Sequence, residues 1–217
     1  MQRPSYLAMN DDPLAALYQH YNVVQIRHTG NQLPAFFDMP IVRDAHMPTH
    51  VLAVTQTTNS YSTIPPLMIP VDFNMYSDGF RVSIIPTPLP GTASPVPIVN
   101  GSSAMVSLPV VPISVPHVQS LPLLLLFGLG LERNTNALAL RMLPSEVVAE
   151  FPNAATMAQL MARLDDRHFK RRLEFNQGMW QNVLALDLRD ITLLNLIRTA
   201  WNITAEARGL RMQGQWR

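Results

Sequence analysis

Between Arg81 and Glu132 the chain runs for 50 consecutive residues without one Asp, Glu, Lys or Arg. Across all 217 residues 14% are charged, whereas a typical soluble domain carries about 25%. A stretch of this length without charge cannot form the charged surface that soluble domains usually present to water. The polar surface of this region must therefore come from Ser, Thr, Asn and Gln, or partners must cover it, and this constrains the fold more than any motif does.

The remaining charges divide unequally at about residue 131. Residues 1–131 hold four Arg and six Asp, with no Lys or Glu, for a net charge of −2. Residues 132–217 hold 11 Arg, one Lys, four Asp and five Glu, for a net charge of +3. We therefore expect two structural regions, 1–131 and 132–217. The absence of cysteine excludes disulfide frameworks, thiol nucleophiles and thiolate zinc sites.

The first region is predicted to be β-rich. Short apolar or β-branched runs recur between turn signals, at 22–27, 35–42, 50–57, 67–76, 80–85, 97–100, 104–113 and 121–131. Their spacing predicts a sandwich or barrel-like sheet, with Asp78-Gly79 as a hairpin turn. One short helix is expected before the sheet, because Asp12 suits an N-cap and Pro13 suits the first helical position.

Proline distinguishes the charge-free stretch, since nine of the 19 prolines lie between Pro86 and Pro122. Because proline donates no hydrogen bond to a sheet ladder, we expect edge strands or extended arms there. The same segments are rich in Val, Ile and Leu, so we expect them either to wrap their own domain or to lie along a partner. The residues assigned to partner binding are Pro86, Pro88, Pro90, Pro109, Pro112 and Pro116.

The second region is predicted to be helical, which makes the chain α+β. Asn153 is expected to cap a helix over 154–164, and Asp165 or Asp166 to open a longer helix through about residue 184 that Gly178 weakens. Asp187 or Asp190 is expected to open the last helix, which should end at Gly209. Its predicted apolar stripe consists of Leu193, Leu194, Ile197, Trp201 and Ala205.

The longest apolar run, Leu121–Leu131, has 11 residues, whereas a membrane-spanning helix needs about 20. We therefore expect a buried strand there and no membrane span. The first residues contain no apolar segment of the kind that signal peptides carry. A cytoplasmic or virion location is the corresponding expectation.

Three patterns were weighed as sites for chemistry. Asp44, His46 and His50 would offer a carboxylate and two imidazoles, but Pro48 interrupts them and no further ligand is identifiable. Gly128-Leu-Gly130 lacks the third glycine of a dinucleotide-binding loop. No serine has the flanking glycines of a nucleophile elbow. We therefore expect no metal, cofactor or catalytic residue, and a protein that is not an enzyme.

Residues 163–172 form the one basic cluster, in which Arg167, Lys170, Arg171 and Arg172 are candidate nucleic-acid contacts. Asp165, Asp166 and Glu174 interleave with them, and this mixture is also typical of a solvated helix with ion pairs. The net charge of +1 gives no additional field toward nucleic acid, so RNA binding stays an alternative rather than the preferred function.

The composition favours a non-enzymatic structural subunit of a large assembly. The most concrete form of this expectation is a viral capsid-associated protein, either a shell, clamp or protrusion component. Its partners would be other protein subunits, including copies of itself. Two alternatives stay open: a cellular adaptor or scaffold that docks a partner through its C-terminal helices, and an RNA-binding module that uses Arg163–Arg172.

Overall fold

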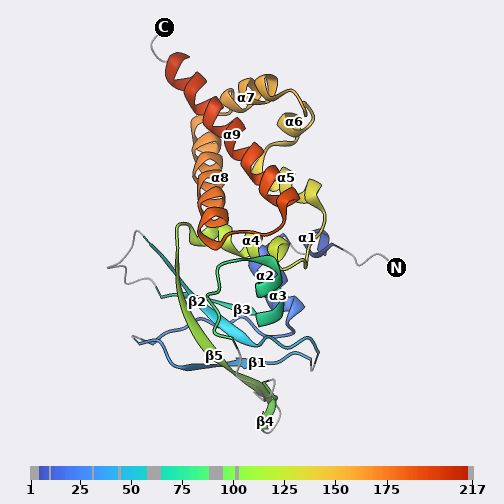
Figure 1. Cartoon of the computed structure of the whole chain (residues 1–217), viewed down its shortest axis with the longest axis vertical. Coiled ribbons are helices and arrows are strands. Elements are labelled where there is room, and N and C mark those ends of the chain that lie inside the picture. Colours follow the sequence, from blue (N-terminus) through green and yellow to red (C-terminus); the bar gives the residue numbers. More distant parts are fainter. Residues whose placement is uncertain are drawn as a thin grey trace.

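The computed structural model describes residues 5–9, 11–30, 32–43, 45–57, 65–87, 95–100 and 103–214. Short helices and strands occupy the first part of the chain, and longer helices occupy the last part (Figure 1). The elements in chain order are α1 (Tyr6–Met9), α2 (Pro13–His20), β1 (Phe36–Pro40), β2 (His50–Gln56), β3 (Leu67–Val71), α3 (Phe73–Gly79), β4 (Ile98–Asn100), β5 (Ser103–Val115), the 3₁₀ turn η1 (Val118–Ser120), α4 (Leu121–Gly128), α5 (Thr135–Met142), α6 (Ser145–Val148), α7 (Ala154–Ala162), α8 (Asp166–Leu186) and α9 (Ile191–Gly214).

Among the described residues, the five strands form one open sheet in the order β1-β5-β2-β3, with β4 paired to β5. The β2 and β5 strands run parallel, and every other pair is antiparallel. The mixed α and β content agrees with the predicted α+β class. The expected sandwich or barrel is not what these strands form, because the sheet is single and does not close.

The long strand β5 lies inside the sheet, which corrects the expectation of edge strands or arms for Pro109 and Pro112. One part of β5 pairs with β1 up to Pro109, and the next part pairs with β2 from Val110 onward. Val110 donates its N–H to Ala35 O at 3.0 Å. Because N–H groups alternate sides along a strand, Pro112 turns its missing donor beyond the end of β1. Pro109 turns its missing donor toward the β2 side, one residue before β2 pairing begins. The change of neighbour therefore accommodates both prolines.

The core has two parts, one on each face of the sheet. The larger part joins residues from both halves of the chain, for example Leu52 and Val115 from strands and Val183 and Ile197 from α8 and α9. The smaller part lies on the other face, where Tyr18 and Tyr21 pack against strand residues such as Met39. Apolar packing is therefore continuous across residue 131, where the charge density changes.

Side-chain caps place four of the helices where the sequence predicts them. Asp12 accepts a hydrogen bond from Leu14 N at the start of α2. The side chains of Asn153, Asp165 and Asp190 do the same at α7, α8 and α9. These four predicted starts are confirmed, because each cap satisfies backbone N–H groups that the first turn leaves without partners.

Several local expectations are wrong. Leu121–Leu131 begins with helix α4 rather than forming a strand, and all seven residues from Leu121 to Phe127 are buried. Asp78-Gly79 ends helix α3 instead of turning a hairpin, and residues 81–85 that follow are irregular. The run at 22–27 forms only an isolated bridge from Val23 to Ile41. Helix α9 continues through Gly209 to Gly214.

Helix α4 lies across the middle of the molecule, between the sheet and the hairpin of α8 and α9 (Figure 1). A helix that is apolar on all sides needs protein on all sides, and this position supplies it. Periodicity does not separate such a helix from a buried strand over 11 residues. None of the helices in the described part of the chain has the length and apolar character needed to cross a membrane.

Candidate functional site

The end of the sheet that lies farthest from the helices carries exposed apolar side chains. Strand pairing aligns Phe36 with Pro109, Pro40 with Met105, and Ile98 with Met105. Directly paired residues project to the same side of a sheet. We call this surface the distal sheet face, and it consists of Phe36, Asp38, Pro40, Ile98, Met105, Ser107 and Pro109.

The distal sheet face is exposed because the helical layer ends before it. Along the same face of β5, Val111 and Val115 are buried in the larger core. Nearer the β4 end, Phe36 is 62% exposed and Ile98 is 57% exposed. Figure 1 shows α2 and α3 beside β2 and β3, while β4 projects away from every helix. Asp38 is the single charged residue on this face.

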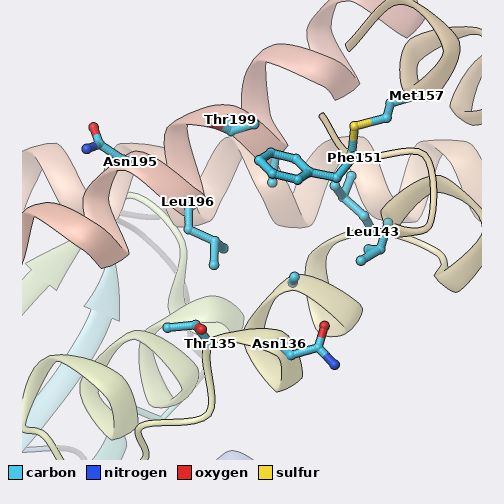
Figure 2. A pocket seen from close by; sticks show the side chains of 11 residues that line it. Thr135, Asn136, Leu143, Phe151, Met157, Asn195, Leu196 and Thr199 are labelled. Atoms are coloured by element: carbon cyan, nitrogen blue, oxygen red, sulfur yellow. The ribbon is translucent and has the colours of Figure 1, made fainter. Parts of the chain in front are cut away.

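A second candidate is a pocket of about 580 Å³ between α5, α9 and the connection from α6 to α7 (Figure 2). Its floor is buried and its rim is exposed, and none of its 11 lining residues is charged. The floor is formed by Leu143, Met157 and Ala200, the half-buried walls by Ala139, Val148 and Leu196, and the rim by Thr135, Asn136, Phe151, Asn195 and Thr199.

The prolines assigned to partner binding do not gather at one place. Pro109 belongs to the distal sheet face, Pro112 is exposed farther along β5, and Pro116 is half-buried after its end. Pro86 is exposed in an irregular segment, whereas Pro88 and Pro90 lie outside the described residues. Their role in partner binding stays a prediction.

The four candidate residues of the basic cluster differ in exposure. Arg167, Lys170 and Arg171 are exposed on α8, and Lys170 Nζ lies 3.9 Å from Glu174 Oε1. Arg172 is half-buried, and its guanidinium donates to the backbone oxygen of Arg141. Arg172 therefore has a contact inside the fold, and nucleic-acid contact by all four residues stays a prediction.

The two histidines of the candidate metal site contact other residues. His46 is exposed, and its ring stacks on His20 with the ring centroids 5.7 Å apart. His50 Nδ1 lies 2.9 Å from Thr49 Oγ1, and burial lowers the pKa of His50. Asp44 lies outside the described residues. Within the described ranges, no group of three His, Asp or Glu side chains is arranged to hold a metal ion.

Gly128 and Gly130 serve packing and chain reversal. A Cβ on Gly128 would lie 2.4 Å from Phe80 Cζ, and a Cβ on Gly79 would lie 2.1 Å from Gly128 O. These glycines let α3 and α4 approach closely. Gly130 follows α4 with φ +68°, a conformation that glycine adopts without strain. Neither observation points to a nucleotide.

A buried polar cluster joins α8 to the end of β5, and sequence patterns gave no sign of it. Asn182 Nδ2 donates to His117 O at 2.6 Å and to Ser120 Oγ at 3.1 Å. Asn182 Oδ1 accepts from His117 N at 3.1 Å. Gly178, one turn earlier, leaves the space for this contact, because a Cβ there would lie 2.2 Å from His117 Cγ. The predicted weak point in the helix is thus a docking position for His117.

Glu132 is a second buried polar group, at 4% exposure. It accepts hydrogen bonds from Ser5 Oγ at 2.5 Å and from three backbone N–H groups, those of Leu7, Arg133 and Asn134. Burial raises the pKa of Glu132, but these hydrogen bonds outweigh burial and lower its pKa overall. The carboxylate therefore ties α1 to the start of the helical half, which is a structural role.

No protein-family model matches this chain, and no curated protein and no solved structure matches it either. The sites described above consequently depend on the geometry and chemistry of this chain alone. Of these, the distal sheet face and the apolar pocket are the two surfaces of the described residues on which the proposals below depend.

Proposed function

We propose that the chain is a non-enzymatic structural subunit that docks onto other protein subunits, copies of itself included, through the distal sheet face. The observation that carries this proposal is the uneven cover of β5. The same strand face is buried at Val111 and Val115 but open where Phe36 and Ile98 lie.

The chemistry of this face favours a protein partner. Exposed apolar groups that share one face are typical of interaction sites, because their burial removes apolar area from water. The face is built from neighbouring strands and is not a hollow, so a partner must offer a broad surface. Asp38 is its one charge, and a partner therefore needs apolar surface with little charge to match it.

The setting that we propose is a capsid-associated shell, clamp or protrusion. Support for it comes from composition: residues 1–131 carry only ten charged residues and include the 50 residues without charge. A surface that is permanently covered by neighbouring subunits does not need the charge density that keeps free proteins apart. Copies of one chain in a closed assembly meet this condition.

The test compares two pairs of exposed apolar residues by size-exclusion chromatography with light scattering over a wide range of concentrations. The first variant carries Phe36→Asp and Ile98→Asp on the distal sheet face. The matched control carries Leu184→Asp and Ile191→Asp, which change side chains of similar exposure, 60% and 64%, in the helical half. We expect the wild-type chain and the control to associate as concentration rises, and the first variant to stay monomeric.

Two results would overturn the proposal. One is a wild-type chain that stays monomeric at every concentration, because copies of the chain would then not associate. The other is equal loss of association in both variants, which would indicate a non-specific effect of added charge. Circular dichroism of each variant shows whether it is folded before its mass is interpreted.

A further inference from the structure

We propose that the pocket between α5, α9 and the α6–α7 connection binds an uncharged, largely apolar small molecule that carries one hydrogen-bond acceptor. This site lies in the helical half and shares no residue with the distal sheet face. The inference therefore stands independently of the proposed role in assembly.

The size and shape of the pocket fit a small molecule. Ligand sites in proteins are concave and measure about 300–1,000 Å³, and this pocket measures about 580 Å³. Ala139 on α5 and Ala200 on α9 contribute small side chains to its lining, which leaves the space between the two helices unfilled. Leu143 and Met157 close the bottom with apolar atoms. A ligand that fills this volume gains contacts that the bare walls lack.

The lining selects against a charged ligand. An ion that enters the pocket loses its hydration, and none of the 11 lining residues carries an opposite charge. The polar groups of the rim are hydroxyls and amides, contributed by Thr135 and Asn136 from α5 and by Asn195 and Thr199 from α9. A neutral molecule meets no such penalty, so the ligand class is uncharged.

Asn195 is one of the rim residues that can donate a hydrogen bond to a ligand. Arg198 Nη2 donates to Asn195 Oδ1 at 3.0 Å, so that the carbonyl side of this amide already has a partner. The NH₂ side of Asn195 is then the group that can donate to a ligand. A hydroxyl, ether or carbonyl oxygen at one end of the ligand would accept this bond.

Phe151 supplies the other end of the site. Its side chain is 69% exposed, yet it lines the pocket. Figure 2 shows the ring reaching from the α6–α7 connection toward α9, with Leu143 and Met157 nearby and Asn195 toward the other end of the pocket. Figure 2 also shows Thr199 beside this ring, so that polar groups lie along the rim and apolar groups lie below them. A ligand lying along the pocket would cover an aromatic ring that is otherwise in water.

The experiment uses the full chain with Nile red, a neutral dye whose emission rises in apolar surroundings, and displaces it with 1-octanol or with octanoate at neutral pH. We expect saturable binding of one dye per chain and displacement by octanol at concentrations roughly tenfold or more below those of octanoate. Equal displacement by the two compounds would overturn the assignment of an uncharged ligand.

Variants locate the dye. Ala139→Phe fills the pocket, and we expect it to weaken dye binding by roughly tenfold or more. Leu140→Phe is the matched control, because it adds an aromatic ring at the next position of the same helix, outside the lining, and should leave binding unchanged. Loss of binding in the Phe36→Asp, Ile98→Asp variant instead of Ala139→Phe would place the dye on the distal sheet face and overturn the pocket.

A second variant tests the Asn195 donor without filling the cavity. Asn195→Leu removes the amide donor at an exposed position, so folding should be preserved. We expect octanol to bind roughly fivefold more weakly to this variant, while benzene, which needs no donor, binds as well as before. Asn202→Leu, an exposed asparagine on α9 outside the lining, is the control. Equal effects of Asn195→Leu on octanol and benzene would contradict the assigned hydrogen bond.

Discussion

The two ends of the molecule both leave apolar surface uncovered, but they do so with opposite shapes. At the sheet end, Phe36 and Ile98 are exposed on β1 and β4, the two strands that pair with the same part of the sheet, β5. At the helical end, the apolar groups line a hollow, with Leu143 and Met157 buried at its floor. The outward surface suits a broad protein partner, whereas the hollow suits a small molecule.

This difference shows what charge density does and does not indicate. The half with ten charges among 131 residues is the half whose outward surface is apolar. The half with 21 charges among 86 residues carries them on exposed helix positions such as Arg167 and Lys170. The charge pattern does not indicate the pocket of this half, because a pocket needs only a few small residues that face each other.

The largest effect on stability is expected at the polar cluster that joins the sheet end to the helical end. Replacing Asn182 with Ala leaves the N–H of His117 without its partner, and it removes the shorter of two hydrogen bonds to the carbonyl of His117, the other coming from Ser120 Oγ at 3.4 Å. Each buried polar group left unsatisfied costs about 1–3 kcal/mol, so we expect the free energy of unfolding to fall by about 3 kcal/mol. Urea denaturation measures this loss. Gln181→Ala, at the exposed neighbouring position, is the control and should change stability by less than about 0.5 kcal/mol.

The chain carries its own reporters for this experiment. All three tryptophans lie after residue 132, and all five tyrosines lie before it. Because the larger core spans both halves, we expect tryptophan fluorescence and tyrosine absorbance to report one coincident transition, in the wild-type chain and in Asn182→Ala. Separate transitions in the wild-type chain would contradict a core shared by the two ends.

The second largest effect is expected at Glu132, which fastens α1 to the helical half. In Glu132→Gln the remaining oxygen can keep the two backbone N–H groups of Arg133 and Asn134 at the Oε1 position, so that the NH₂ group takes the Oε2 position, where it cannot accept from Leu7 N. We expect a loss of about 2 kcal/mol and faster hydrogen exchange at Leu7. The exposed Glu150→Gln is the control. Unchanged exchange at Leu7 would contradict the fastening role.

Local signals in the sequence were sufficient for the helix starts and insufficient for the sheet. Asp12, Asn153, Asp165 and Asp190 cap helices through bonds to residues two or three positions away, so that a short window contains the whole cause. The order of the strands depends on pairings such as Val51 with Val110, which are distant in sequence. Spacing alone therefore suggested a sandwich or barrel where an open sheet forms.

The two candidate sites were missed for a related reason. Phe36 follows the period-2 alternation of β1, but this alternation does not show whether helices cover its face. Only the position of the helical layer decides which part of β5 the helices cover. The pocket brings Ala139 and Ala200 together from helices 61 residues apart. Gly178 appeared as a weak point because its partner, His117, lies on another element. In each case the missing information is a contact between distant segments.

A smaller effect is expected from pH at the junction between the two ends. Burial lowers the pKa of His117 from its usual value of 6.5, and the nearby Glu174 carboxylate opposes this shift. His117 Nδ1 accepts from Ser120 N at 3.2 Å, which requires the neutral ring. As pH falls below 6.5 the unfolded chain takes up a proton that the folded chain resists. Stability is therefore full above pH 6.5 and declines below it until the folded pKa is passed.

The measurement for His117 is the free energy of unfolding at neutral and mildly acidic pH. His117→Asn keeps an acceptor for Ser120 N and does not titrate, so its stability should decline less on acidification. The pKa of His50 is also lowered by burial, so His50→Asn measures the parallel contribution of that residue. The Glu132 carboxylate acts in a separate window, because its stabilisation is lost only below its usual pKa of 4.5. An identical pH slope in His117→Asn and the wild-type chain would assign the decline to other groups.

The smallest effect on stability is expected from single exposed apolar residues, one at each end of the molecule. In dilute solution, we expect Phe36→Ser and Leu184→Ser each to change the free energy of unfolding by less than about 0.5 kcal/mol, since both side chains are mostly in water. At high concentration the two should diverge. Association stabilises the folded chain by mass action, so the wild-type melting temperature should rise with concentration. Leu184→Ser should follow this rise and Phe36→Ser should not. Melting curves over a range of concentrations therefore separate an apolar residue that a partner covers from one that water covers, although both look alike in a single chain.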